Sequence, residues 1–73
     1  MDKDILKGKW LQVKDDVRAW WSKMTEEDVE HIQGDAERFI GKLKERYGYP
    51  REQAEKEIND FLKMPDSRRR RTA

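Results

Sequence analysis

The segment from Asp35 to Leu62 carries two helical apolar stripes separated by a glycine, and this pattern restricts the segment to a helical hairpin. Each stripe recurs at steps of three or four residues, which places its members on one side of a helix. Gly48 follows the first stripe, where glycine can adopt the left-handed conformation that ends a helix. Pro50 suits the first turn of a new helix, because it has a helical φ and no N–H to satisfy. The stripes are Ala36, Phe39, Ile40, Leu43 and Tyr47, followed by Ala54, Ile58, Phe61 and Leu62.

The first half of the chain carries a second pair of helical stripes. The longer stripe predicts a helix that starts at Asp4 and ends at Trp21, and a shorter helix follows before Gly34. Two α-hairpins packed across one another would bury all four stripes. The sequence therefore predicts an all-α fold, a compact bundle of four helices arranged as two packed α-hairpins. The stripes of this half are Leu6, Trp10, Val13, Val17, Trp20 and Met24, followed by Val29 and Ile32.

The predicted helix ends carry residues that are typical of caps. Thr25 can cap the second helix by accepting a hydrogen bond from the N–H of Asp28, and Asp35 can cap the third helix. Gly41 lies inside the third helix, where glycine costs up to about 1 kcal/mol relative to alanine. We therefore expect Gly41 to mark a close approach between two helices.

A chain of 73 residues suffices for one small domain, because cores rarely divide below roughly 100 residues per domain. We expect residues 1–64 to form this helical domain and residues 65–73 to form a flexible, disordered, Arg-rich tail. Cysteine is absent from the sequence, which excludes a disulfide framework and a thiolate metal site. No apolar run approaches the roughly 18 residues of a membrane span. The charged start of the chain is unlike a signal peptide, so the sequence predicts a cytoplasmic protein.

Charge is distributed unevenly along the chain. The formal net charge is +1, from 17 Lys and Arg against 16 Asp and Glu. Four of the positive charges are Arg68, Arg69, Arg70 and Arg71, so the preceding residues have 13 positive and 16 negative side chains and a net charge of −3. Four arginines on a tail suit the phosphates of nucleic acid or an anionic membrane surface. The alternative is a solubilising tail without a specific partner.

The adjacent tryptophans form a second candidate for binding. On a helix, Trp20 and Trp21 point about 100° apart, so one of them can remain partly exposed beside Arg18 and Lys23. Such an indole could bind a protein partner, a nucleic acid base or a membrane interface, or support self-association. The alternative is that both tryptophans pack in a core that is short of aliphatic side chains.

Residues that could carry out a reaction are few. His31 is the only histidine, and Glu27, Asp28 and Asp35 lie about one turn from it in the sequence. An acidic metal cluster is the alternative here, but one imidazole without cysteine favours a surface histidine. The serine and threonine hydroxyls have no obvious histidine partner for nucleophilic catalysis. The sequence thus predicts no catalytic, cofactor or metal site, no small-molecule substrate and no enzymatic activity.

Several short motifs spread over residues 2–62 carry a family resemblance. They are Trp10-Leu11-Gln12 with Lys14, the stretch from Trp21 to Asp28, Gly34, Gly41-Lys42-Leu43, Glu45-Arg46-Tyr47-Gly48-Tyr49 and Gln53-Ala54-Glu55-Lys56-Glu57. In this order and spacing the motifs resemble the CsbD/YjbJ-like family of small bacterial general stress proteins. The stretch from Glu45 to Glu57 is the most specific part of the resemblance.

The resemblance implies a compact all-α bundle and production under general stress, and it implies no particular reaction. We therefore expect a general stress-response protein that acts as a small, non-enzymatic helical interaction or protective module. The alternative is a nucleic-acid-associated protein that is anchored through its Arg-rich tail.

Overall fold

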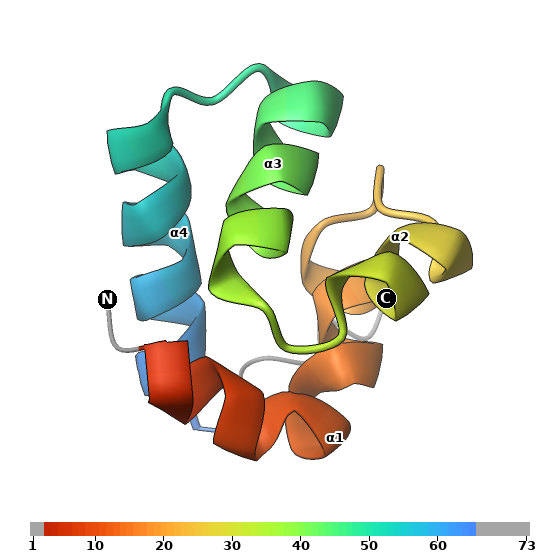
Figure 1. Ribbon diagram of the computed structural model, residues 1–73, viewed down its shortest axis with the longest axis vertical. Helices are drawn as coiled ribbons and strands as arrows, with labels where there is room; N and C mark the ends of the chain where they lie inside the picture. Colours follow the sequence, from red (N-terminus) through yellow and green to blue (C-terminus); the bar gives the residue numbers. More distant parts are fainter. Residues whose placement is uncertain (1–2, 66–73) are drawn as a thin grey trace.

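The computed structural model describes residues 3–65, which form four α-helices (Figure 1). The helices are α1 (Lys3–Trp20), α2 (Glu26–Ile32), α3 (Ala36–Tyr47) and α4 (Arg51–Lys63). Helices α3 and α4 lie side by side, α1 lies across the lower end of this pair, and the short α2 packs against both α1 and α3. No strand occurs in the described part of the chain. The predicted all-α bundle of two hairpins is therefore confirmed.

The core contains side chains from all four helices and from the turn between α1 and α2. All of the predicted stripe residues are buried except Trp20 and Tyr47, which are half-buried and pack against the core. Trp21 lies between two central phenylalanines, with ring centroids 5.2 Å from Phe39 and 4.9 Å from Phe61. Aromatic contacts in tilted and edge-on geometries stabilise a core beyond the effect of buried area alone.

The predicted caps are confirmed. The Thr25 hydroxyl accepts a hydrogen bond from the N–H of Asp28 at 3.1 Å, and the Asp28 carboxylate accepts one from the N–H of Thr25 at 3.0 Å. The Asp35 carboxylate accepts hydrogen bonds from two backbone N–H groups in the first turn of α3, at 2.9 and 3.1 Å. Gly48 has the left-handed conformation, with φ of 70°, at the end of α3.

Two predicted helix boundaries differ from the structure. Helix α1 ends at Trp20, and the chain then turns, so that the N–H of Met24 donates to the carbonyl of Trp21 at 3.0 Å. Trp21 and Met24, on either side of this turn, are both buried in the core. Pro50 precedes α4 with an extended ψ of 163°, and its carbonyl accepts the hydrogen bond from the N–H of Ala54. The first helical residue of α4 is therefore Arg51.

The prediction for Gly41 was wrong. Gly41 is exposed, and a Cβ atom placed on it would meet no neighbouring atom within 4 Å. The close approach lies instead at Gly34, which has φ of +78°, and where a Cβ would lie 3.1 Å from the Cβ of Trp10 and 3.2 Å from the Cα of Lys7. Gly34 therefore allows the connection between α2 and α3 to pass directly against α1.

Candidate functional site

A groove between α1 and α2 is the candidate functional site of the described residues. It has a volume of about 310 Å³, and we refer to it as the α1–α2 groove. Its residues recur at steps of three and four on each helix, so each helix contributes one face to the groove. The groove is lined by Trp10, Leu11, Lys14, Asp15 and Arg18 from α1, by Glu26, Val29 and Glu30 from α2, and by Gln33, the residue that caps the end of α2.

The centre of the groove is apolar. Trp10 and Val29 are buried and close its floor. Leu11 stands at its edge with 81% of its surface exposed, and the other exposed large hydrophobic residue in the described part of the chain is Ile5, at 46%. An exposed leucine beside an apolar floor is typical of a surface that binds another protein element.

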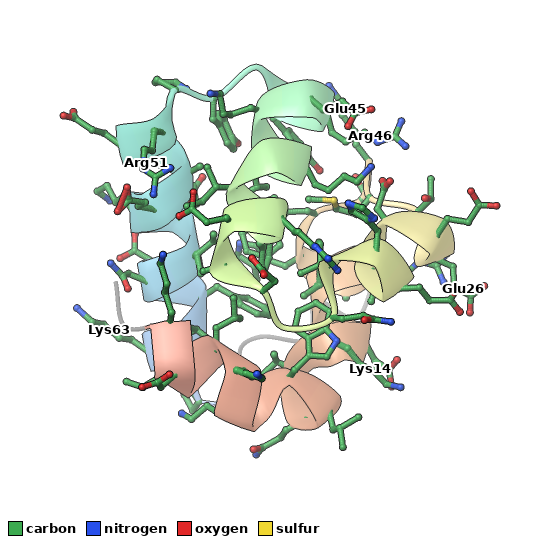
Figure 2. All side chains as sticks on the ribbon, viewed as in Figure 1. Lys14, Glu26, Glu45, Arg46, Arg51 and Lys63 are labelled. Carbon is green, nitrogen blue, oxygen red and sulfur yellow. The ribbon has the colours of Figure 1, made fainter. Side chains whose placement is uncertain are left out.

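The two sides of the groove have opposite net charges, +1 on the α1 side, where Asp15 offsets one of the two basic residues, and −2 on the α2 side. Lys14 and Arg18 line the α1 side, whereas Glu26 and Glu30 line the α2 side. Figure 2 shows Lys14 and Glu26 on the same side of the molecule, projecting from the two helices. Within residues 3–65 none of these four side chains forms an ion pair or a hydrogen bond. The charges of these four residues are therefore not neutralised by another side chain in the described part of the chain.

Asp28, on α2, is in contrast fully engaged. It is 3% exposed, and Arg46 donates to its carboxylate from Nε at 2.8 Å and from Nη2 at 3.1 Å. The Nζ atom of Lys42 lies 3.4 Å from the same carboxylate. The hydrogen bonds from Arg46 lower the pKa of Asp28 far below its ordinary value, against the opposing effect of burial. This cluster joins α2 to α3 and thereby fixes the acidic wall of the groove.

A second ion-pair network joins α1, α3 and α4. Arg51 donates to the Glu37 carboxylate from Nη1 at 2.9 Å and from Nη2 at 2.6 Å, and Lys3 lies 3.6 Å from the same group. Arg51 also pairs with Glu55 within α4 at 3.0 Å. The Arg51 hydrogen bonds lower the pKa of Glu37 to about 2. Lowered carboxylate pKa values indicate structural ion pairs, whereas a general acid requires a raised pKa.

The structure places the four predicted interaction residues in different surroundings. Trp21 is 3% exposed and belongs to the core, whereas Trp20 is half-buried against Trp21, with ring centroids 6.4 Å apart. Lys23 packs on α3, with its Nζ 5.2 Å from the ring centroid of Tyr47 and its backbone N–H donating to the Tyr47 hydroxyl at 3.0 Å. Arg18 lines the α1–α2 groove. A binding role for these residues stays a prediction.

Sequence reasoning missed most of the groove. Leu11 lies off the buried stripe of α1, and its neighbours in the sequence are those of a solvated helix face. The available signal was the spacing of Leu11, Lys14 and Arg18 at i, i+3 and i+7, which matches the spacing of Glu26, Val29 and Gln33 along α2 and its C-cap. Two such faces on consecutive antiparallel helices adjoin one another.

His31 is exposed, and its backbone carbonyl accepts a hydrogen bond from Nη1 of Arg38 at 3.1 Å. Within residues 3–65 no group of three or more histidine or acidic side chains is placed to hold a metal ion. No helix in that range combines the length and apolar character that a membrane span requires. The predicted contact residues Arg68 to Arg71 lie outside the described residues, so their role also stays a prediction.

The fold and the groove together define a class of protein, a small bundle of four helices with a charged groove on its surface. The chain is 43% identical over 61 residues to UPF0337 protein PA4738 of Pseudomonas aeruginosa, a match that covers 84% of this chain and 94% of the relative. It is 46% identical over 61 residues to UPF0337 protein pc0632 of Protochlamydia amoebophila, with 84% and 92% covered. It is 44% identical over 61 residues to UPF0337 protein YjbJ of Escherichia coli K12, with 84% and 88% covered.

These identities over most of both chains establish the family. The chain belongs to the UPF0337 family, the CsbD/YjbJ-like family whose motifs the sequence carries. No family model and no solved structure matches the chain.

Proposed function

We propose that this protein is a non-enzymatic interaction or protective module of the bacterial general stress response. It acts in the cytoplasm and contacts its partner through the α1–α2 groove. The family resemblance supports the stress setting, and the geometry of the groove supports the interaction. Neither a cofactor nor a small-molecule substrate is part of this proposal.

The observation that carries the proposal is the arrangement of unpaired charges around an exposed leucine. Lys14 and Glu30 leave their charges unpaired within residues 3–65, although Asp28 and Glu37 elsewhere in the bundle each bind an arginine. Leu11 adds an exposed apolar anchor at the edge of a partly apolar floor. Interfaces combine such a central apolar contact with a polar, charged rim.

The electrostatics of the carboxylates support a role without catalysis. Asp28 and Glu37 have lowered pKa values, and in both cases an arginine hydrogen bond is the main cause. Such groups stay ionised and hold helices together, and they are poor proton donors near neutral pH.

Complementation of a bacterial strain that lacks its UPF0337 gene tests this proposal. The wild-type chain should restore survival under osmotic or oxidative stress, and the variant Leu11→Lys should fail to do so at equal protein level. Ile5→Lys is the matched control, because Ile5 is the other exposed large hydrophobic residue on α1 and lies outside the groove. Full survival with Leu11→Lys would contradict a role of the groove, and no rescue by the wild type would contradict the stress role.

The alternative function, association with nucleic acid, depends on Arg68, Arg69, Arg70 and Arg71 alone. Binding through such a tail would be independent of nucleic acid sequence and strongly weakened by salt. The same tail chemistry suits an anionic membrane surface.

A further inference from the structure

We propose that the α1–α2 groove binds a second copy of this chain, with the two grooves facing each other across a two-fold axis that runs along the groove. This inference rests on the proposed function of the groove as an interaction surface, and it names the partner. It follows from the charges of the two sides, from the direction of the two helices and from the exposure of Leu11.

The two sides have opposite net charges, because Asp15 offsets only one of the two basic residues of the α1 side, and this makes the groove complementary to itself. A two-fold axis along the groove places the α1 side of one copy opposite the α2 side of the other copy. Lys14 and Arg18 of each copy then face Glu26 and Glu30 of its partner copy. A two-fold axis perpendicular to the groove would instead place like charges opposite each other, which is unfavourable.

The directions of α1 and α2 determine which residues of the two copies face each other across this axis. Helix α2 starts near the end of α1, and Gly34, just after α2, lies against Trp10 near the middle of α1. The two helices therefore run in roughly opposite directions along the groove. A two-fold axis along the groove keeps each residue at its own level, which pairs Lys14 of one copy with Glu30 of the other.

Leu11 supplies the apolar contact of this dimer. Its side chain is 81% exposed in the single chain, and in the facing arrangement it lies over the α2 side of the second copy, where Val29 forms part of the floor. A groove of this size contributes a small interface, in the class below about 1,200 Å² that supports weak and transient association. We therefore expect a monomer–dimer equilibrium that depends on protein concentration.

Charge reversal tests the pairing directly. In sedimentation equilibrium from micromolar to millimolar concentration, Lys14→Glu and Glu30→Lys should each weaken self-association by about tenfold or more, because each places like charges opposite each other twice. An equimolar mixture of the two variants should recover wild-type association, since every facing pair is then of opposite sign. The chain that carries both substitutions should also recover it.

Two further variants serve as controls. Lys9→Glu changes the net charge by the same amount as Lys14→Glu, but Lys9 lies on α1 outside the groove. This variant should leave self-association unchanged. Leu11→Gln should weaken association without loss of helix content, because the Leu11 side chain is exposed in the single chain. Circular dichroism of every variant confirms that the fold is retained.

A wild-type protein that remains monomeric up to millimolar concentration would overturn this inference. So would a dimer for which the mixture of Lys14→Glu and Glu30→Lys associates no better than either variant alone. If either result is found, loss of stress survival with Leu11→Lys would still support the groove as an interaction surface. The partner would then be a different molecule, such as an amphipathic peptide. The inference and the proposed function can therefore fail separately.

Discussion

Replacing Asp28 with asparagine removes the negative charge from a buried carboxylate and changes little in its shape. The asparagine keeps one oxygen that can accept from Arg46 or from the N–H of Thr25, but it turns an amide NH₂ towards a guanidinium or towards Lys42. Hydrogen bonds to charged groups contribute about 1.5–3 kcal/mol each, so we expect Asp28→Asn to lower the free energy of unfolding by about 2–3 kcal/mol.

This loss is large for such a small domain. A single core of this size usually gives a net stability of about 3–5 kcal/mol. The expected decrease in the melting temperature is roughly 10–20 °C. Urea unfolding at neutral pH, followed by tryptophan fluorescence and by circular dichroism, measures the free energy directly. The control is Glu37→Gln, which alters an arginine pair of 2.6 Å, shorter than the 2.8 Å pair at Asp28. The Glu37 side chain is 48% exposed, so this substitution should change the melting temperature little.

The pH dependence gives the same prediction a second test. The Arg46 hydrogen bonds hold the folded-state pKa of Asp28 below its ordinary value of 3.8, so the unfolded chain binds a proton there more readily than the folded chain does. The stabilisation by Asp28 is then fully present above about pH 5 and is lost as the pH falls through the folded-state pKa. The difference in stability between wild type and Asp28→Asn should therefore narrow from about pH 5 towards pH 2. Equal stability at neutral pH, or a difference that does not narrow in acid, would refute this account.

Two other predictions concern the glycines and the tail. Gly34→Ala should lower the melting temperature, because its φ of +78° and the backbone of α1 leave no room for a Cβ, whereas Gly41→Ala should raise it through the better helix propensity of alanine. Thermal unfolding followed by circular dichroism measures both melting temperatures. A higher melting temperature for Gly34→Ala than for Gly41→Ala would contradict the assignment of the close approach to Gly34. Deletion of residues 68–73 should abolish DNA binding in a mobility-shift assay at low salt, and unchanged binding by the shortened chain would exclude the Arg-rich tail as the anchor.

Local sequence patterns were sufficient to predict the four helices. Apolar spacing and helix caps depend on residues within a few positions of one another, as in the pair Thr25 and Asp28 or in Asp35 with the first turn of α3. The end of α1 was harder to place, because Trp20, Trp21 and Met24 all continue the apolar spacing. Burial of Trp21 between two phenylalanines decides that boundary, and this contact depends on the tertiary fold.

Features that depend on contacts between distant residues were not predictable in this way. The sequence makes Gly41 look unusual because it lies inside a helix, yet its position faces solvent. The position that requires glycine is Gly34, and the requirement comes from Trp10, which lies 24 positions earlier. Asp28 likewise looks like an ordinary capping residue, because its arginine partner lies 18 positions away on another helix.

The same contacts that fix α2 also explain why the charges of the groove stay apart. Near its end, α2 is followed by Gly34 in direct contact with α1, and near its start Asp28 is bound to Arg46 on α3. Helix α2 is therefore held at both ends, and its acidic face does not close onto Lys14 and Arg18 within the described chain. A short helix that was free to move would bring opposite charges together and fill the groove. The ion pair between α2 and α3 thus joins the two helices and also holds the acidic side of the groove apart from Lys14 and Arg18.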